Sequence, residues 1–287
     1  MSERRVVVTG MGVVSPVGND IETFWKSLIE GRSGIRRFQA FDSADYDCKI
    51  AGEVPDFEPV RYFKNPKTVK RTDRFTQFAM AGAKMAIEDS AIDLDQVDRN
   101  RFGVMIGSGI GGLYSMEQES QRLMTRGPSR VSPFTIAMMI SNMASGIVSM
   151  EYDLRGPNMC IVTACATANN SIGEAWRIIK FGDADGFIAG GCEATITPLG
   201  IGGFGSMKAL SLRNDDPTKA CRPFDINRNG IVVSEGGCLY ALERLEDAQR
   251  RGAKIYAEVV GHCINSDAAD FVLPLAERQN ECMRGAL

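Results

Sequence analysis

One ten-residue stretch constrains the fold of this chain more than any other. Residues 159–168, MCIVTACATA, run from an apolar, partly β-branched segment into Cys165, which has small neighbours. Beyond it, the i, i+3, i+4 and i+7 spacing of one helix face is filled by Ile172, Ala175, Trp176 and Ile179. The pattern predicts a strand, a tight turn at Cys165 and then a helix.

A cysteine at the start of a helix is suited to nucleophilic chemistry. Unpaired N–H groups and the helix dipole favour an anion there, and the thiolate is the nucleophilic form of cysteine. The same N–H groups can stabilise an oxyanion on a carbonyl under attack. The alternative is a buried structural cysteine, because free cysteine is among the most buried residue types. Position alone favours that alternative for Cys165, and the flanking segments described below reverse the balance.

The composition excludes several classes of protein. The chain of 287 residues has a net charge of -3, so the whole chain is not built to coat nucleic acid. No apolar stretch approaches the roughly 20 residues that span a bilayer, and the N-terminal apolar run is too short for a signal peptide. Eight cysteines without a C-x-x-C spacing, with one histidine, speak against a zinc site and indicate reduced thiols. We expect a cytoplasmic protein without a metal.

Apolar runs alternate with helical stripes along the chain. Strands are predicted at 5–9, 102–107, 186–191, 231–241 and 255–261. The helical stripes include one from Phe75 to Ala86, capped by Thr72 or Asp73, and one face formed by Ile136, Ile140, Met143 and Ile147. The glycine-rich stretch 198–212 is predicted to loop before a short helix.

This alternation predicts an α/β fold around a largely parallel sheet. Ligands bind such sheets beyond the carboxyl ends of the strands. Three features are expected at that end: a turn at Gly10–Gly12, the glycine loop at 107–112, and Cys165.

Residues 107–112, GSGIGG, match the G-x-G-x-x-G spacing of a dinucleotide-binding turn. The fingerprint wants an acidic residue about 20 positions further on, where this chain has Arg126 to Arg130. Glycines that allow close backbone approach are the better interpretation. A nucleotide-binding oxidoreductase is an alternative that rests on the glycine loops alone.

Six basic residues stand in loops or at helix starts: Lys67, Lys70, Arg71, Arg126, Arg130 and Arg213. Their default interpretation is solvated charge, and the functional one is a docking surface for an acidic partner. A cysteine nucleophile normally works with a base, most often histidine. The only histidine, His262, is far along the chain from Cys165, and a structural role is its default.

Five segments occur in a specific order: 6–18 (VVVTGMGVVSPVG), 107–112 (GSGIGG), 163–167 (TACAT), 198–204 (PLGIGGF) and 220–225 (ACRPFD). Together they resemble the β-ketoacyl-acyl carrier protein synthases, in particular the type II condensing enzymes that elongate long acyl chains. Several long segments in order are far more specific than one glycine loop. The resemblance covers essentially the whole chain and implies a thiolase-type layered fold of two similar βαβαβ-based halves.

The resemblance implies a role for each matching position. The reaction would be that of fatty acid elongation, with acyl transfer from an acyl carrier protein to Cys165 and then decarboxylative condensation with malonyl-acyl carrier protein. Ile110 and Phe134 would line or gate the acyl-chain pocket, and Phe204 would lie near the active-site entrance. The six basic residues would form the docking surface for the acidic carrier protein. The resemblance also implies a homodimer and no organic cofactor, while composition implies no nucleic acid or membrane partner.

The chain also departs from the family pattern. The family completes its site with two histidines, in Asn-Ala-His-Gly-Thr and Lys-x-x-x-Gly-His type segments, and neither segment is present. We therefore expect a C-terminal truncation, with residues 1–252 forming a first half that carries the nucleophile and residues 253–287 beginning the second. The two histidines would stabilise the enolate formed on decarboxylation, so we expect the chain alone to be inactive in condensation. The alternative is a non-catalytic ketosynthase-like partner subunit or chain-length module, against which Cys165 argues.

Overall fold

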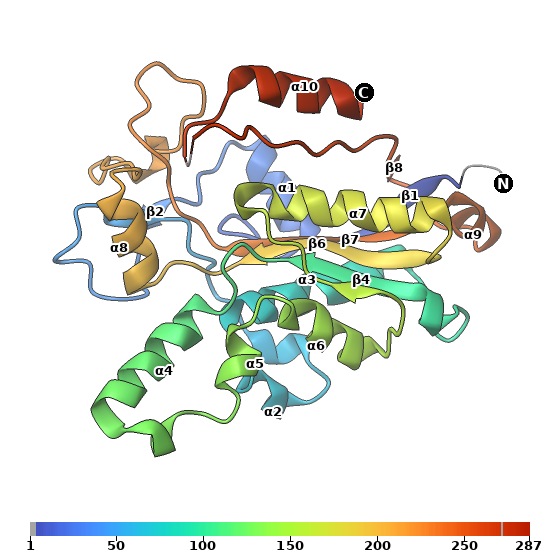
Figure 1. Cartoon of the computed structure of the whole chain (residues 1–287), viewed down its shortest axis with the longest axis horizontal. Helices are drawn as coiled ribbons and strands as arrows, with labels where there is room; N and C mark the ends of the chain where they lie inside the picture. The colour runs from blue at the N-terminus through green and yellow to red at the C-terminus, as the bar shows by residue number, and fades with distance from the viewer. Residues whose placement is uncertain (1–3, 271) are drawn as a thin grey trace.

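A mixed sheet of six strands lies at the centre of the computed structural model, which describes residues 4–270 and 272–287 (Figure 1). The strands lie in the order β5-β4-β6-β7-β1-β8. Their bounds are Asn158–Met159 for β5, Phe102–Gly107 for β4, Gly186–Glu193 for β6, Gly236–Arg244 for β7, Val6–Val14 for β1 and Ala257–Glu258 for β8. A separate small sheet pairs β2 (Arg36–Arg37) with β3 (Ile50–Ala51).

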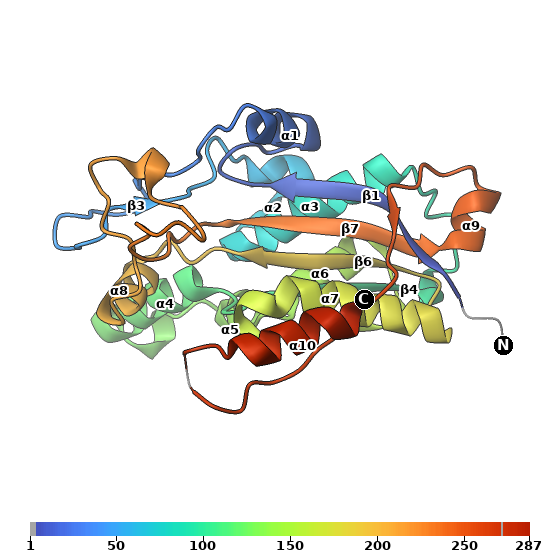
Figure 2. The same cartoon turned by 90° about the horizontal axis from the view of Figure 1, so that it is seen from above.

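The strand directions correct the expectation of a largely parallel sheet. β4 runs parallel to β5 and β6, whereas β7 runs antiparallel to both of its neighbours, β6 and β1. A parallel pair needs a crossover connection along the sheet. The segment between β6 and β7 instead stays at the end where β6 finishes, so Glu193 pairs with Gly236 and the chain returns antiparallel (Figure 2).

The helices lie on both faces of the sheet, with α3 and α6 on one side and α7 on the other (Figure 1). The α-helices are α1 (Ile21–Ile29), α2 (Pro66–Val69), α3 (Arg74–Ser90), α4 (Leu113–Arg126), α5 (Thr135–Met139), α6 (Met143–Tyr152), α7 (Thr167–Phe181), α8 (Pro198–Ser206), α9 (Leu245–Arg250) and α10 (Ala276–Ala286). Short 3-10 helices are η1 (Pro59–Tyr62), η2 (Arg99–Arg101), η3 (Pro128–Arg130), η4 (Ala164–Ala166) and η5 (Pro217–Lys219).

Gly10 and Gly12 lie inside β1, and the turn predicted for them is wrong. A Cβ on Gly12 would lie 2.0 Å from the carbonyl oxygen of Gly82, and one on Gly10 would lie 2.1 Å from that of Ala86. Both carbonyls belong to α3, which crosses β1 at this point. The glycines serve close helix–strand packing, so they mark a crossing inside the sheet and not a ligand site at its end.

Three further sequence expectations need correction. The helix face expected from Ile136 to Ile147 is broken into α5 and α6 because the backbone of Ile140 is extended. The glycine-rich stretch after Pro198 is the helix α8 itself, whose N-terminus is capped by Thr197 Oγ1 accepting from Gly200 N at 3.0 Å. The strands expected at 231–241 and 255–261 are confirmed only over β7 and β8.

Two apolar clusters fill the faces of the sheet. The cluster on the α3 and α6 side includes Phe75, Phe78, Ile106, Val148 and Leu239. The cluster on the α7 side includes Val6, Met105, Ile179, Phe187 and Leu242. A third, smaller cluster packs the β2–β3 sheet against α8. The sheet is therefore buried on both faces, as apolar strands in an α/β fold require.

The C-terminal segment lies outside α7. Residues 259–265 and α10 run along this helix in both views (Figures 1 and 2). A Cβ on Gly173 of α7 would lie 2.0 Å from Cδ2 of His262, so the imidazole ring packs directly on the helix. The division of the chain at residue 252 stays a prediction. Among the described residues, no helix is both long and apolar enough to cross a membrane.

Candidate active site

Cys165 lies on a sharp turn between the sheet and α7. The chain leaves β5 after Met159 and reaches η4, which directly precedes the first residue of α7. Ala164 has a φ of 49°, in the left-handed region that costs a non-glycine residue about 1–2 kcal/mol. The thiol of Cys165 is exposed. The predicted turn and helix are confirmed, although the strand before them is shorter than expected.

Side chains of α7 hold the turn in place. Thr163 donates its N–H to Thr167 Oγ1 at 2.8 Å, and Asn170 Nδ2 donates to Thr163 Oγ1 at 2.8 Å. Both partners lie within the first turn of α7 or just beyond it. The residues around Cys165 are thereby fixed by the helix on which they stand.

Two glycines let the start of α7 approach the sheet. A Cβ on Gly107, the last residue of β4, would lie 2.2 Å from Cγ2 of Thr167. A Cβ on Gly191 of β6 would lie 2.8 Å from Cβ of Ala168. The first glycine of the G-x-G-x-x-G match therefore has a packing role. This agrees with the interpretation that these glycines allow close backbone approach.

The glycine loop 107–112 lies against the Cys165 turn. A Cβ on Gly109 would lie 3.6 Å from the carbonyl oxygen of Ala164. Gly111 has a φ of 81° and packs on the carbonyl oxygen of Met139. The loop is thus enclosed by the turn on one side and by the end of α5 on the other.

The carboxylate of Glu193, at the end of β6, was missed by sequence reasoning. It accepts hydrogen bonds from Ser108 Oγ at 3.0 Å, from Gly109 N at 2.7 Å and from Ile110 N at 3.2 Å. Burial raises the pKa of Glu193, and these hydrogen bonds oppose that shift. The one available signal was an acidic residue at the end of a buried strand that faces a glycine loop.

The three residues expected at the acyl pocket have different surroundings. Ile110 is exposed and lies in the loop beside the Cys165 turn. Phe134 lies at the start of α5, and the guanidinium of Arg71 is 4.7 Å from its ring centroid. Phe204 of α8 packs against the third cluster. Their roles in an acyl pocket stay predictions.

Five of the six predicted docking residues lie at one end of the molecule. Lys67 belongs to α2, with Lys70 and Arg71 directly after it, while Arg126 ends α4 and Arg130 ends η3. The ends of α2 and α4 both lie at the bottom of Figure 1.

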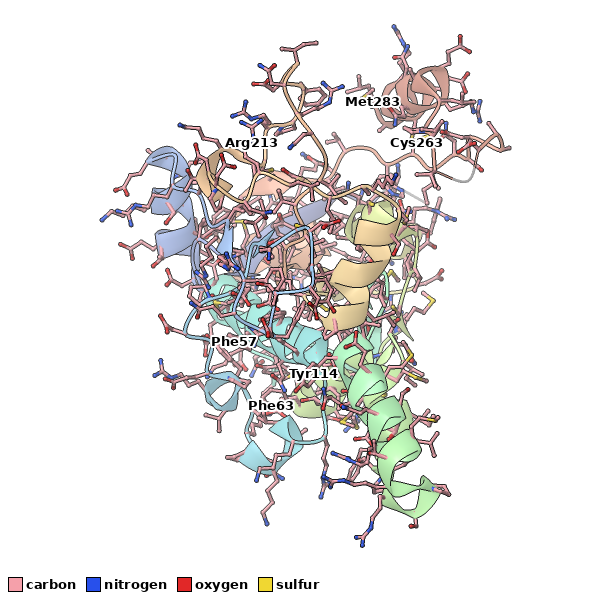
Figure 3. All side chains as sticks on the ribbon, turned by 90° about the vertical axis from the view of Figure 1, so that its left-hand side faces the viewer. Phe57, Phe63, Tyr114, Arg213, Cys263 and Met283 are labelled. Atoms are coloured by element: carbon pink, nitrogen blue, oxygen red, sulfur yellow. The ribbon has the colours of Figure 1, made fainter. Side chains whose placement is uncertain are left out.

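Arg213 is the exception among the six. It lies far from that end in Figure 3, and its Nη2 donates to the carbonyl oxygen of Asn227 at 3.2 Å. This half-buried side chain braces its own loop. The structure does not bring it together with the other five.

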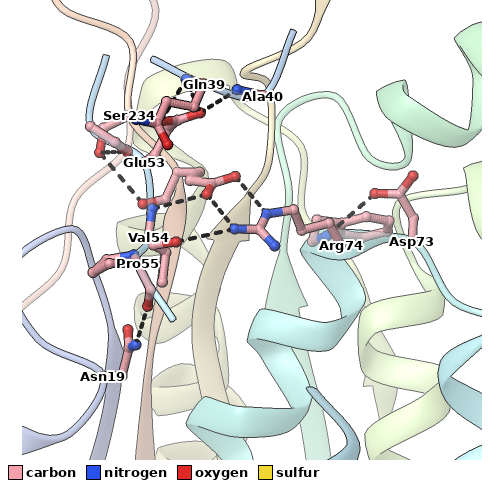
Figure 4. Close-up of polar contacts among 12 residues, drawn as sticks. Asn19, Gln39, Ala40, Glu53, Val54, Pro55, Asp73, Arg74 and Ser234 are labelled. Atoms are coloured by element: carbon pink, nitrogen blue, oxygen red, sulfur yellow. Dashed lines mark hydrogen bonds and ion pairs between the residues drawn. The ribbon is translucent and has the colours of Figure 1, made fainter. Parts of the chain in front are cut away.

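A polar wall lies between α3 and the segment after β3 (Figure 4). Arg74 donates through Nε and Nη2 to the two carboxylate oxygens of Glu235, at 2.8 and 2.6 Å. Asp73 accepts from Phe75 N at 3.3 Å and from Ser115 N at 2.8 Å, which joins the N-termini of α3 and α4. Burial raises the pKa of Asp73.

Asp73, Arg74, Ser115 and Glu235 line a cavity of about 1180 Å³. Pro198 of α8 and Met138 of α5 also face it. The sequence identified Asp73 as a helix cap, but it gave no local signal that pairs Arg74 with Glu235, 161 positions away.

Cys160, Cys192 and His262 are less exposed than Cys165. Burial raises the pKa of Cys160 and raises that of Cys192 well above the ordinary value. Burial also lowers the pKa of His262. Its ring packs on Gly173, two helical turns beyond the site, which agrees with a structural role. Among the described residues, no group of His, Cys, Asp or Glu side chains is arranged to hold a metal ion.

Solved structures share this fold. A ketosynthase/chain length factor of the ishigamide system matches with a TM-score of 0.92 and 31% identity, over all of this chain and 70% of that one. A beta-ketoacyl synthase from Burkholderia phymatum matches with a TM-score of 0.89, 31% identity, and coverage of 99% and 70%. A type II polyketide ketosynthase, solved in complex with its acyl-carrier protein, matches with a TM-score of 0.87, 30% identity, and coverage of 99% and 70%. The expected thiolase-type fold is confirmed.

Sequence comparison points the same way. A 3-oxoacyl-[acyl-carrier-protein] synthase 2 from Coxiella burnetii is 47% identical over all of this chain and 70% of its own length. The protein of the same name from Synechocystis is 46% identical over 96% of this chain and 66% of its own length. The chain thus spans about two thirds of these relatives. Residues 3–248 match the family described as beta-ketoacyl synthase, N-terminal domain, and the chain belongs to the β-ketoacyl synthases.

Proposed function

We propose that this protein is a condensing enzyme of fatty acid elongation and that Cys165 accepts the acyl group. The observation that carries the proposal is the turn before α7, which presents an exposed thiol in a chain of the β-ketoacyl synthase family. The 15-residue helix α7 begins two residues after this thiol, and its first turn has N–H groups without partners inside the helix. The contacts of Thr163 with Thr167 and Asn170 keep that geometry fixed before substrate arrives.

The half-reaction at Cys165 exchanges one thioester for another. The thiolate attacks the carbonyl carbon of an acyl group carried as a thioester, and the negative charge moves to the carbonyl oxygen. Backbone N–H groups at the start of α7 are suited to hold that oxyanion. The intermediate then collapses, the bond to the carrier sulfur breaks, and the carrier leaves as a thiol after taking up a proton. The step requires no cofactor.

The acidic donor of the acyl group would be an acyl carrier protein that docks at the shared end of α2 and α4. Lys67, Lys70, Arg71, Arg126 and Arg130 are exposed there, and opposite charge steers such encounters. One solved relative is a ketosynthase in complex with its acyl-carrier protein, which supports this class of partner. We leave Arg213 out of the docking surface because its guanidinium braces a separate loop.

For residues 1–287 we propose formation of the acyl-enzyme and no later step of the reaction. Decarboxylative condensation with malonyl-acyl carrier protein requires groups that stabilise an enolate near Cys165. The one histidine of this sequence, His262, packs on α7 at Gly173, away from that site. We therefore expect acyl transfer without condensation from these residues alone.

A cytoplasmic homodimer is part of the proposal. β5 is one of the two edge strands of the sheet, and an edge strand offers unpaired N–H and C=O groups to a second chain. Met159 on that strand is an exposed apolar residue. Sedimentation of the protein at several concentrations tests this part, and a monomer at all concentrations would contradict it.

The acyl-transfer step is tested by mass spectrometry. The chain is incubated with an acyl carrier protein that bears a long acyl chain, and the acyl mass increment is located by peptide mapping. We expect the increment on Cys165, its loss in Cys165→Ala and its retention in Cys221→Ala, because Cys221 is also exposed. Equal labelling of Cys165→Ala would exclude Cys165 as the nucleophile.

The docking surface is tested by charge reversal. Lys67→Glu combined with Arg126→Glu should raise the KM for the acyl carrier protein about tenfold or more, because like charges would then face each other. Acylation by a small acyl thioester without a carrier should not change. Lys26→Glu, at an exposed position of α1, is the matched control. A KM that responds equally to all three substitutions would contradict a localised docking surface.

A further inference from the structure

Glu193 is a half-buried carboxylate that acyl transfer, as described above, does not use. It is the last residue of β6, and its side chain turns toward the glycine loop 107–112. The three groups that donate to it are uncharged: one hydroxyl and two consecutive backbone N–H groups. A carboxylate that accepts from all three of these donors fixes the conformation of the loop that carries them.

The hydrogen bonds of Glu193 reach three consecutive residues directly and a fourth through Ser108. Oε1 accepts from Ser108 Oγ at 3.0 Å, and Oε2 accepts from Gly109 N at 2.7 Å and from Ile110 N at 3.2 Å. Ser108 Oγ in turn accepts from Gly111 N at 3.0 Å. The conformation of the whole segment from 108 to 111 therefore depends on one side chain.

This segment touches the nucleophile's turn. A Cβ on Gly109 would lie 2.9 Å from Glu193 Oε2 and 3.6 Å from the carbonyl oxygen of Ala164. Gly109 is thus enclosed between the carboxylate and the residue directly before Cys165. The next residue, Ile110, donates its N–H to Glu193. Its apolar side chain is exposed beside the turn.

We propose that Glu193 is a positioning residue that holds Ile110 beside Cys165 and thereby sets which acyl chain lengths Cys165 accepts. This inference rests on the proposed acyl transfer to Cys165 and on the predicted place of Ile110 in the acyl pocket. Glu193 touches neither the thiol nor the acyl group. It acts through the backbone of residues 108–110, because only an acceptor with two oxygens satisfies all three donors at once.

The substitution Glu193→Gln tests this role with little change in size. The amide keeps one acceptor oxygen and places an NH₂ group against donors, so the loop loses its fixed conformation. The measurement is the rate of acylation of Cys165 by two acyl thioesters, one of six and one of sixteen carbons. We expect the ratio of the two rates to change about fivefold or more in Glu193→Gln, because the wall formed by Ile110 is no longer fixed.

A second reagent separates positioning from damage to the fold. Alkylation of Cys165 by iodoacetamide reports the thiol and its turn, and it does not depend on Ile110. We expect this alkylation rate to stay within about twofold of the parent while the chain-length ratio changes. Equal loss of both acylation rates and of alkylation would show a merely structural role and would overturn the inference.

Ser108→Ala keeps the test decisive if Glu193→Gln does not fold. It removes one of the three donors and leaves the two backbone N–H groups, so it should shift the ratio in the same direction by a smaller factor. Glu174→Gln is the control, because this carboxylate on α7 pairs with Arg177 at 2.8 Å and does not touch the loop. An unchanged ratio in Ser108→Ala and Glu193→Gln would overturn the inference. Failure of the proposed function appears differently, as absent acylation in the parent chain itself.

Discussion

The two helices on opposite faces of the sheet, α3 and α7, are built for different tasks. Of the 17 residues of α3, 11 are buried, and Arg74 at its first position pairs with Glu235. Of the 15 residues of α7, six are buried, and Phe181 at its end is 70% exposed. The start of α7 carries the turn with the exposed thiol of Cys165.

The difference shows that stability and chemistry are divided between the faces. The small residues of α3 bring its backbone against β1, where packing leaves little space. A partly buried ion pair joins the N-terminus of α3 to the segment before β7. α7 approaches the sheet closely at its first turn, through Gly107 and Gly191, and it buries Ala175 and Ile179 against the sheet further along. Its outer side faces the C-terminal segment. Substitutions can therefore be aimed at one function or the other.

Removal of one aromatic ring from each helix should give the largest contrast. Phe78 of α3 is fully buried, so Phe78→Ala should lower the free energy of unfolding by about 3–5 kcal/mol. Phe181→Ala on α7 should change it by less than about 0.5 kcal/mol. Urea unfolding of the two variants measures both values, and similar losses would show that the two faces are equally packed.

The ion pair at the start of α3 should give the next largest effect. Arg74→Met leaves the buried Glu235 without its partner and should cost roughly 2 kcal/mol, less than for a fully buried pair because 36% of the Arg74 side chain is exposed. Arg155→Met breaks an exposed pair with Asp153 and should cost at most about 0.5 kcal/mol. Urea unfolding of the two variants measures the loss of unfolding free energy in each. Equal losses would mean that the α3 pair adds nothing beyond a surface contact.

A methyl group at Gly107 tests the close packing between the start of α7 and the sheet. The new Cβ would meet Thr167, so Gly107→Ala should cost about 1–2 kcal/mol and slow the acylation of Cys165 by moving the start of α7. Gly203→Ala in α8 meets nothing within 4 Å and should raise stability by about 0.5–1 kcal/mol. Thermal unfolding measures the stability of both variants, and the acylation rate of Cys165 is measured beside it. If Gly107→Ala changes neither quantity, the turn does not require a glycine at position 107.

A thiol on the α3 side should give a small dependence on pH. Burial raises the pKa of Cys192 well above 9.0, so above pH 9 the unfolded chain releases a proton that the folded chain keeps. Stability contributed by this group is complete below pH 9 and falls as pH rises, by at most about 1.4 kcal/mol per pH unit. Cys192→Ala should reduce the slope of the free energy of unfolding between pH 9 and 10, measured by urea unfolding at both pH values. An unchanged slope in Cys192→Ala would contradict the assignment.

Local patterns predicted the parts of the fold that local forces decide. The helix α3 and its cap at Asp73 follow from an apolar stripe and one carboxylate, and β4 and β6 follow from short apolar runs. The turn at Cys165 follows from small residues between an apolar run and a helical stripe. In each case, the information lies within about 15 residues of chain.

Long-range contacts decided what the sequence could not show. The direction of β7 depends on which strands it pairs with, and Gly10 is explained only by Ala86 on a crossing helix. The break between α5 and α6 at Ile140 is not marked by a glycine or proline at that position. Glu193 and Glu235 look like ordinary surface carboxylates in sequence, although each is satisfied by donors from distant segments.

The central place of β7 also affects how the chain is made. The side chain of Thr9 in β1 donates to Glu243 in β7, 234 positions later. At synthesis rates of roughly 5–20 residues per second, β1 leaves the ribosome on the order of ten to fifty seconds before the strand that pairs with it. During that interval, the apolar strand has no permanent neighbour on its β7 side. β1 can therefore complete its pairing only after β7 has been made.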